Sequence, residues 1–386
     1  MKSDKIFDGY QMLEGYVLIV SDDGTIQDLM PANLAPADVE VVEGILSPGL
    51  INCHCHLELS HMKGQIPEKT GLVDFVFKVV TERHASQHEI MQAIEMAEEE
   101  MISNGIVAVG DICNNTSTLS QKQKGRLQYY NFIEASGWLP ESSTQRFETS
   151  KEIFYQFDNV AYMGKKPQAS IVPHAPYSVS ENLWQLIQPF FKQAVVSIHN
   201  QETKFEDDFF LEGTGDFERM YRLMKIDNAH HKPTKRSSLQ TYFDKLAGAS
   251  KSLLVHNTFT KQDDINYIIQ AGKNWPGHEV YFCLCINANQ YIEDALPPIE
   301  LLRRNDCTVV LGTDSLASNR GLNILDEIRT IRLNFPYIPL EELLKWATSN
   351  GARALQLDDE LGSFEKGKKP GLLLIDEETL QVQKIF

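Results

Sequence analysis

The sequence predicts an α/β fold, a (β/α)8 TIM barrel with a small composite β-sandwich built from both termini. Two observations predict the barrel. Short apolar runs alternate with helical segments over residues 49–359, and four of these runs end in a histidine or an aspartate. A third observation predicts the sandwich, because both ends of the chain carry short apolar runs without helical periodicity. We therefore assign residues 49–359 to the barrel, and residues 1–48 and 360–386 to the sandwich.

Eight apolar runs qualify as barrel strands, which is the number that this fold requires. They lie at residues 50–53, 106–111, 127–133, 169–173, 195–199, 252–256, 279–284 and 308–312. Helical periodicity is clear at residues 85–105, and residues 340–357 predict a further helix. Ser180 is suited to cap the N-terminus of another helix, and Thr260 with Asp263 resembles a capping box that opens the helix at 262–271.

Four of the apolar runs end in residues that can bind a metal or move a proton. The first is followed by His54 and His56, whose side chains point to the same face if the segment is a strand. Two neutral imidazoles at a strand end supply half of a metal site, although a His-x-His pair alone could equally be structural. Three more runs end in His199, with Glu202 three residues on, in His256 and in Asp314. Because a (β/α)8 barrel gathers its strand ends at one mouth, we expect these residues to converge there.

Residues 204–246 form the longest interruption of the alternating pattern and mix aromatic with acidic residues. A long connection in a compact domain is usually functional, so we interpret it as a partly helical cover over the barrel mouth. A surface excursion without a role is the alternative.

Composition limits the class of partner and the setting. The net charge of −17 argues against a nucleic-acid partner or an anionic membrane surface. No apolar run is long enough to span a bilayer, and no signal peptide is evident. Six cysteines in 386 residues fit a reducing, cytoplasmic setting better than a disulfide framework. We expect a small-molecule substrate and a homo-oligomer, a dimer.

Several motifs together resemble the amidohydrolase superfamily over essentially the whole chain. Within it the chain is most similar to the hydrolytic deaminases and chlorohydrolases, which include guanine, cytosine and adenosylhomocysteine deaminases. Residues 56–60 and 72–83 are also similar to aminofutalosine deaminases. The motifs are Ser47-Pro48-Gly49-Leu50-Ile51-Asn52, His54-x-His56-Leu57-Glu58, His199-x-x-Glu202, His256, Gly312-Thr313-Asp314-Ser315 and the segment 347–355.

The resemblance implies one divalent metal ion, zinc in the first place or iron, held by His54, His56, His199 and Asp314. It further implies that Glu202 shuttles protons and that His256 polarises the substrate or the attacking oxygen.

The resemblance also implies that His174, in the segment His174-Ala175-Pro176-Tyr177-Ser178, contacts the substrate. We expect Ser315 and Asn287 to bind substrate too. The segment 283–289 around Asn287 lacks the Cys-Pro-x-Ser-Asn pattern of many relatives, which leaves the substrate's identity open.

This donor set is suited to hydrolysis, and the resemblance implies that the bond is a C–N bond other than a peptide bond. Neutral imidazoles and a carboxylate around a metal lower the pKa of a bound water to roughly 7. Asp314 can accept that water's proton, and Glu202 can act as a general acid. We predict deamination of a purine- or pyrimidine-type base, a nucleoside or a related amino-heterocycle. The alternatives are a cyclic amidase or chlorohydrolase, and a non-catalytic metal-binding barrel.

Overall fold

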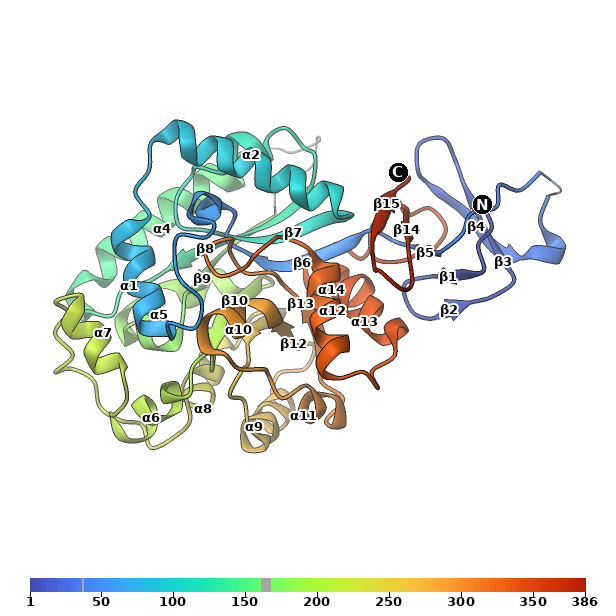
Figure 1. Cartoon of the computed structure of the whole chain (residues 1–386). Coiled ribbons are helices and arrows are strands. Elements are labelled where there is room, and N and C mark those ends of the chain that lie inside the picture. The colour runs from blue at the N-terminus through green and yellow to red at the C-terminus, as the bar shows by residue number, and fades with distance from the viewer. Residues whose placement is uncertain (37, 161–167) are drawn as a thin grey trace.

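The computed structural model describes residues 1–36, 38–160 and 168–386. Its larger part is built on eight strands in two four-stranded sheets, and helices lie around these strands (Figure 1). Within each of two four-stranded sheets, neighbouring strands are parallel. One sheet contains β6 (Leu50–Cys55), β7 (Ile106–Cys113), β8 (Gln128–Ala135) and β9 (Gln168–Pro173). The other contains β10 (Val195–Asn200), β11 (Lys251–His256), β12 (Glu279–Leu284) and β13 (Thr308–Leu311).

Main-chain bonds at two seams close these sheets into a barrel. Between β9 and β10, the His199 N–H donates to the His174 carbonyl at 3.0 Å. Between β13 and β6, the N–H groups of Thr313 and Asp314 both donate to the His54 carbonyl at 3.0 Å. Each of the eight predicted runs is a barrel strand, so the predicted fold class is confirmed. The seams also lie at residues of the predicted site.

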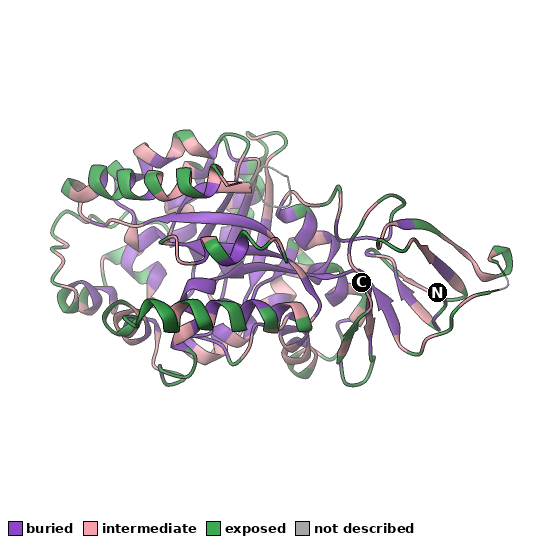
Figure 2. Cartoon of the chain, turned by 90° about the horizontal axis from the view of Figure 1, so that it is seen from above, coloured by how far each residue is buried: buried purple, intermediate pink, exposed green. Residues whose placement is uncertain are grey.

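Helices and short 3-10 turns surround the barrel. Figure 2 shows that its strands are almost wholly buried, whereas the helices expose one face. The helices are α1 (Leu72–Glu82), α2 (Gln87–Ser103), α3 (Leu119–Lys122), α4 (Ser143–Asp158), α5 (Glu181–Ile187), α9 (Gln262–Gly272), α10 (Ile286–Glu293), α11 (Ile299–Arg304), α12 (Ile324–Asn334), α13 (Leu340–Ala347) and α14 (Ser349–Ala354). The 3-10 turns are η1 (Ala32–Leu34), η2 (Leu57–Met62), η3 (Pro140–Ser142), η4 (Pro176–Ser178), η5 (Gln188–Phe191) and η6 (Phe243–Leu246). None of the described helices is long and apolar enough to cross a membrane.

Two helix predictions need correction, and one is confirmed. Ser180 caps α5 by accepting the Leu183 N–H, as predicted. The capping box at Thr260 is wrong, because α9 begins after Lys261, whose N–H donates to the Asp264 carboxylate at 3.0 Å. The predicted helix at 340–357 is interrupted at Thr348, whose hydroxyl donates to the Leu344 carbonyl at 2.7 Å. Such local side-chain bonds compete with the helical pattern.

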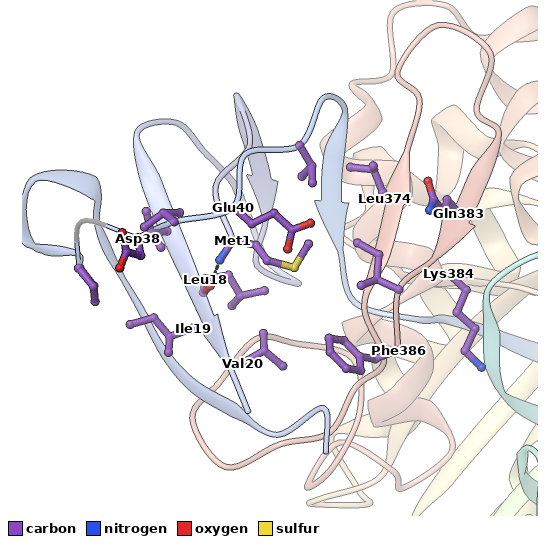
Figure 3. Close-up of a pocket in the computed structure, with 15 residues that line it drawn as sticks. Met1, Leu18, Ile19, Val20, Asp38, Glu40, Leu374, Gln383, Lys384 and Phe386 are labelled. Carbon is purple, nitrogen blue, oxygen red and sulfur yellow. Dashed lines mark hydrogen bonds between the residues drawn. The ribbon is translucent and has the colours of Figure 1, made fainter. Parts of the chain in front are cut away.

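The two ends of the chain meet beside the barrel in a five-stranded sheet. Its order is β15 (Val382–Lys384), β14 (Leu373–Ile375), β5 (Ile45–Ser47), β1 (Lys5–Phe7) and β2 (Met12–Leu13). A second sheet pairs β3 (Tyr16–Val20) with β4 (Ile26–Pro31). A cavity of about 530 Å³ lies at these sheets, with Met1, Leu18 and Phe386 among its lining residues (Figure 3). From this topology we propose that the chain divides into domains near residues 48 and 359.

Residues 204–246 contain α6 (Phe205–Glu212), α7 (Phe217–Leu223), α8 (Ser238–Tyr242) and η6, so the segment is partly helical as predicted. Phe209 and Phe217 of this segment share an apolar cluster with Leu72 of α1 and Ile292 of α10. The helices α6 and α7 therefore pack on elements that follow the barrel strands, whereas Leu239 and Tyr242 of α8 belong to the main core of the barrel.

Candidate metal and catalytic site

The ends of three barrel strands bring together the predicted metal ligands. His54 is on β6, His56 follows it directly, and His199 is on β10. One nitrogen from each of these rings lies within 4.8 Å of the other two. Asp314, which follows β13, places its Oδ1 3.3 Å from His56 Nε2 and 3.6 Å from His54 Nε2. All four side chains are buried.

The predicted proton-transfer residues border the same cluster. His256, at the end of β11, has its Nε2 3.0 Å from His199 Nδ1 and 3.6 Å from Glu202 Oε1. His174, which follows β9, has its ring centroid 4.9 Å from that of His199. The Nδ1 of His174 lies 2.7 Å from the hydroxyl of Ser178. Residues predicted from five different strand ends therefore converge at one mouth of the barrel, as the strand-end rule requires.

Of the two other predicted substrate-binding residues, Ser315 adjoins the cluster of metal ligands, whereas the Asn287 side chain bonds to α12. The Ser315 hydroxyl lies 3.1 Å from that of Ser318, which donates to Asp314 Oδ2, so Ser315 adjoins the cluster. The Asn287 amide instead donates to Glu327 at 3.0 Å and accepts from Thr330 at 2.6 Å, both on α12. Asn289 is the residue of this segment that reaches the cluster, with its Oδ1 2.8 Å from His256 Nδ1. A substrate contact by Asn287 stays a prediction.

Glu134 is a site residue that the sequence reasoning missed. Its Oε1 lies 3.2 Å from His199 Nε2, and its Oε2 accepts a hydrogen bond from the Asn114 amide at 2.9 Å. Glu134 also forms a group of possible metal-ligating side chains with His174 and His199. Because β8 extends two residues beyond the predicted end at 133, the strand-end signal could have identified it.

Several residues at the strand ends have left-handed main-chain conformations. The φ angles are 73° for His256, 58° for Asp314 and 44° for Gln201, which precedes Glu202. Non-glycine residues adopt such angles at a cost of about 1–3 kcal/mol each, and they cluster at functional sites. The surrounding contacts therefore hold these side chains in orientations that the main chain alone disfavours.

Burial and neighbouring charges set the protonation states. Burial lowers the pKa of His199 well below its usual value and that of His256 to about 4, so both imidazoles are neutral at pH 7. Burial opposes ionisation of Asp314, but His54, His56 and His256 outweigh it and hold the pKa of this carboxyl well below normal. Burial, reinforced by Asp314, raises the pKa of Glu202 well above its usual value. The site thus combines the neutral imidazoles of His199 and His256, the ionised carboxyl group of Asp314, and Glu202, whose acid form is favoured.

His54 gives the clearest sign that a cation belongs here. Its side chain is completely buried, yet neither ring nitrogen makes a hydrogen bond within the part of the chain that the structure describes. Buried polar atoms without partners are rare in folded proteins. Three imidazoles and a carboxylate form a common donor set for zinc, and neutral imidazole is the form that binds a metal. The residues present therefore fit a divalent metal ion.

Comparisons with known proteins identify the family of this chain. The sequence model of the Amidohydrolase family matches residues 45–386. The chain belongs to this family. A relative from Helicobacter pylori, an adenosine deaminase, is 26% identical over 85% of this chain and 78% of its own length. A relative from Teredinibacter turnerae, a 5-methylthioadenosine/S-adenosylhomocysteine deaminase, is 25% identical over 95% of this chain and 81% of its own length.

Solved structures of this family share the fold. The crystal structure of Helicobacter pylori aminofutalosine deaminase in complex with methylthio-coformycin matches with a TM-score of 0.80 and 23% sequence identity, over 97% of this chain and 91% of that chain. Together with the family match, this confirms the predicted superfamily, barrel fold and hydrolase class.

A buried ion pair supports the site from the next strand. Lys122 Nζ lies 2.5 Å from Asp111 Oδ2 on β7, and both side chains are fully buried. Asp111 Oδ1 accepts the N–H of Leu57, which follows His56, at 2.8 Å. Asp111 therefore has a structural hydrogen-bonding role next to the metal ligands.

Replacing Lys122 with methionine should lower the free energy of unfolding by about 3–5 kcal/mol, because it leaves the Asp111 carboxylate buried without its partner. Urea denaturation of the metal-loaded protein measures this change. The control is Lys124→Met, which removes an exposed pair with Glu95 and should cost about 1 kcal/mol or less. A Lys122→Met variant as stable as this control would contradict the assignment.

Proposed function

We propose that this protein is a zinc-dependent hydrolytic deaminase of adenosine-type nucleosides. The observation that carries the proposal is the convergence of the three histidines, Asp314, Glu202 and His256 at one mouth of the barrel. The nucleoside class is supported by the two relatives described above, an adenosine deaminase and a 5-methylthioadenosine/S-adenosylhomocysteine deaminase. Without Glu202 and His256, the same cluster would support metal binding alone.

One zinc ion would be held by His54, His56, His199 and Asp314. When bound, it supplies Lewis acidity that makes water a competent nucleophile at neutral pH. The carboxylate of Asp314 stays ionised because the surrounding imidazoles lower its pKa, so it can take a proton from the attacking water.

Glu202 supplies the proton that the substrate needs. Burial raises the pKa of Glu202 well above its usual value, which favours the carboxylic acid form, so Glu202 can protonate a ring nitrogen next to the carbon under attack. After Glu202 has taken up the proton of the newly added hydroxyl, it can pass that proton to the leaving amine, so that ammonia departs instead of the hydroxyl. The proton held by Asp314 then restores the acid form of Glu202.

His256 has a fixed orientation that suits it to receive a hydrogen bond. The Asn289 amide donates to the His256 carbonyl at 3.3 Å, which leaves Asn289 Oδ1 to accept from His256 Nδ1 at 2.8 Å. With the proton on Nδ1, the Nε2 atom is an acceptor that faces the cluster. We propose that His256 Nε2 accepts a hydrogen bond from the attacking oxygen, both when it is water and when it has become the hydroxyl of the tetrahedral centre.

An ammonia-release assay tests the proposal. The zinc-loaded enzyme should release ammonia from at least one of adenosine, 5-methylthioadenosine, S-adenosylhomocysteine and aminofutalosine, and should contain about one zinc per chain. Two strongly bound metal ions at full occupancy, or no ammonia from amino-purines, pyrimidines and pterins, would refute it. Chloride release from a chlorinated triazine without ammonia would favour the chlorohydrolase alternative.

Replacing His174 with alanine should lower kcat/KM about 10- to 100-fold, because a hydrogen bond to substrate worth about 1.5–3 kcal/mol is lost. Zinc content should stay unchanged, since His174 is not one of the four proposed ligands. Kinetics with metal analysis of the same samples measures both quantities. Loss of zinc together with activity would place His174 among the ligands and contradict the prediction.

A further inference from the structure

Glu202 lies on a short connection between β10 and α6 whose main chain is bonded to a second glutamate. The N–H of Gln201 donates to Glu206 Oε1 at 3.0 Å, and the N–H of Glu202 donates to Glu206 Oε2 at 3.2 Å. Each oxygen of one carboxylate therefore receives one of two consecutive main-chain donors. Because Gln201 has a left-handed φ of 44°, this clamp stabilises an otherwise unfavourable turn.

Glu206 also links this connection to α8, which lies near the other end of residues 204–246. Its Oε1 accepts the hydroxyl of Ser238 on α8 at 2.6 Å, and its side chain is fully buried. The three donors are uncharged, and burial raises the pKa of Glu206 to about 8. Burial thus makes the ionised form of this carboxyl group costly, whereas apolar packing alone would hold α6 without that cost. The position of this group therefore points to a role in the adjacent turn.

We propose that Glu206 is a positioning residue that fixes the orientation of the proton shuttle Glu202. Through Ser238, it couples Glu202 to α8, in the second half of residues 204–246. This inference rests on the proposed function. The geometry explains the mechanism: rotation of the peptide between Gln201 and Glu202 would swing the Glu202 carboxyl away from His256, 3.6 Å distant. A displacement of about 1 Å in a reacting group can cost about 10²-fold in rate.

Glu206→Gln tests the proposal, because the amide keeps the shape but turns an N–H₂ group toward one of the donors. We expect kcat per bound zinc to fall about 10- to 100-fold, with KM and zinc content close to those of the wild type. The matched control is Glu212→Gln on the same helix, which removes only an exposed pair with Lys235 of the cover segment. The control should retain wild-type kcat.

Amide hydrogen exchange gives a readout that is independent of activity. In the zinc-loaded protein, the Gln201 and Glu202 amides should exchange at least about tenfold faster in Glu206→Gln than in the wild type or Glu212→Gln. If the wild type deaminates none of the nucleosides tested, the proposed function fails while this measurement still decides the role of Glu206.

Two results would overturn the inference. One is a Glu206→Gln variant with wild-type kcat per zinc. The other is a loss of activity that merely follows zinc content or folded fraction, with unchanged exchange of the two amides. If Glu206→Gln folds poorly, Ser238→Ala decides, since it removes one donor and leaves both main-chain bonds possible. Faster exchange of both amides with a reduced kcat in Ser238→Ala supports the coupling, and wild-type behaviour refutes it.

Discussion

Replacing His199 with alanine should abolish zinc binding and hydrolysis together. His199 supplies one of three imidazoles in the cluster, and its nitrogen lies within 4.8 Å of those of His54 and His56. With one of four ligands removed, the remaining donors leave an open coordination shell. Mutation of residues that only hydrogen-bond to metal ligands typically lowers metal affinity about 10- to 100-fold. The loss in His199→Ala should be larger.

Zinc analysis after dialysis and the ammonia assay measure this prediction on the same preparation. His88→Ala is the control, because it makes the same substitution at an exposed position on α2 and should keep both zinc and activity. A His199→Ala protein that retained one zinc per chain would remove His199 from the ligand set. Excess zinc in the assay should restore little activity, since the lost imidazole leaves the ligand set incomplete.

The barrel was predictable because its strands are buried on both faces. Strands of this kind form continuous apolar runs, and each of the eight runs proved to be a strand. The site was predictable for a related reason: in a closed parallel barrel, all strands present their ends at one mouth. A ligand-type residue after an apolar run, such as His199, His256 or Asp314, can therefore be placed in space from its position in the sequence.

Some site residues could not be predicted, because their position depends on the exact residue at which a helix begins or a strand ends. Asn287 and Asn289 both follow the seventh strand, but α10 begins at Ile286, and residues two apart on a helix point about 200° apart. Only Asn289 faces His256, and a shift of the helix start by two residues would reverse this. Glu134 was missed for a similar reason, because the predicted end of its strand lay two residues too early.

Contacts between distant segments formed the second gap. Lys122 and Asp111 form a buried ion pair, and Glu206 and Ser238 form a hydrogen bond across 32 residues. No periodicity or motif specifies such pairs, because each depends on how the helices pack around the finished barrel. These networks nevertheless touch the site directly, through Leu57 after His56 and through the main chain of Glu202.

Replacing Glu202 with glutamine should separate proton transfer from metal binding. The amide preserves the shape of the side chain but cannot carry or release a proton, so kcat should fall about 10²- to 10⁴-fold. Zinc content should stay at the wild-type value, because Glu202 is not a proposed ligand. The bond from its main-chain N–H to Glu206 does not involve the side chain, so the connection keeps its conformation.

Steady-state kinetics with zinc analysis on the same sample tests this prediction. The informative comparison is with His199→Ala, which should lose both quantities, whereas Glu202→Gln should lose turnover alone. Substrate binding provides the control: KM or the affinity for an unreactive nucleoside should change little in Glu202→Gln. Near-normal turnover in this variant would exclude Glu202 as the shuttle and direct attention to Glu134, the other carboxylate beside His199. Loss of zinc would instead make Glu202 a ligand, so each outcome assigns this carboxyl to one role.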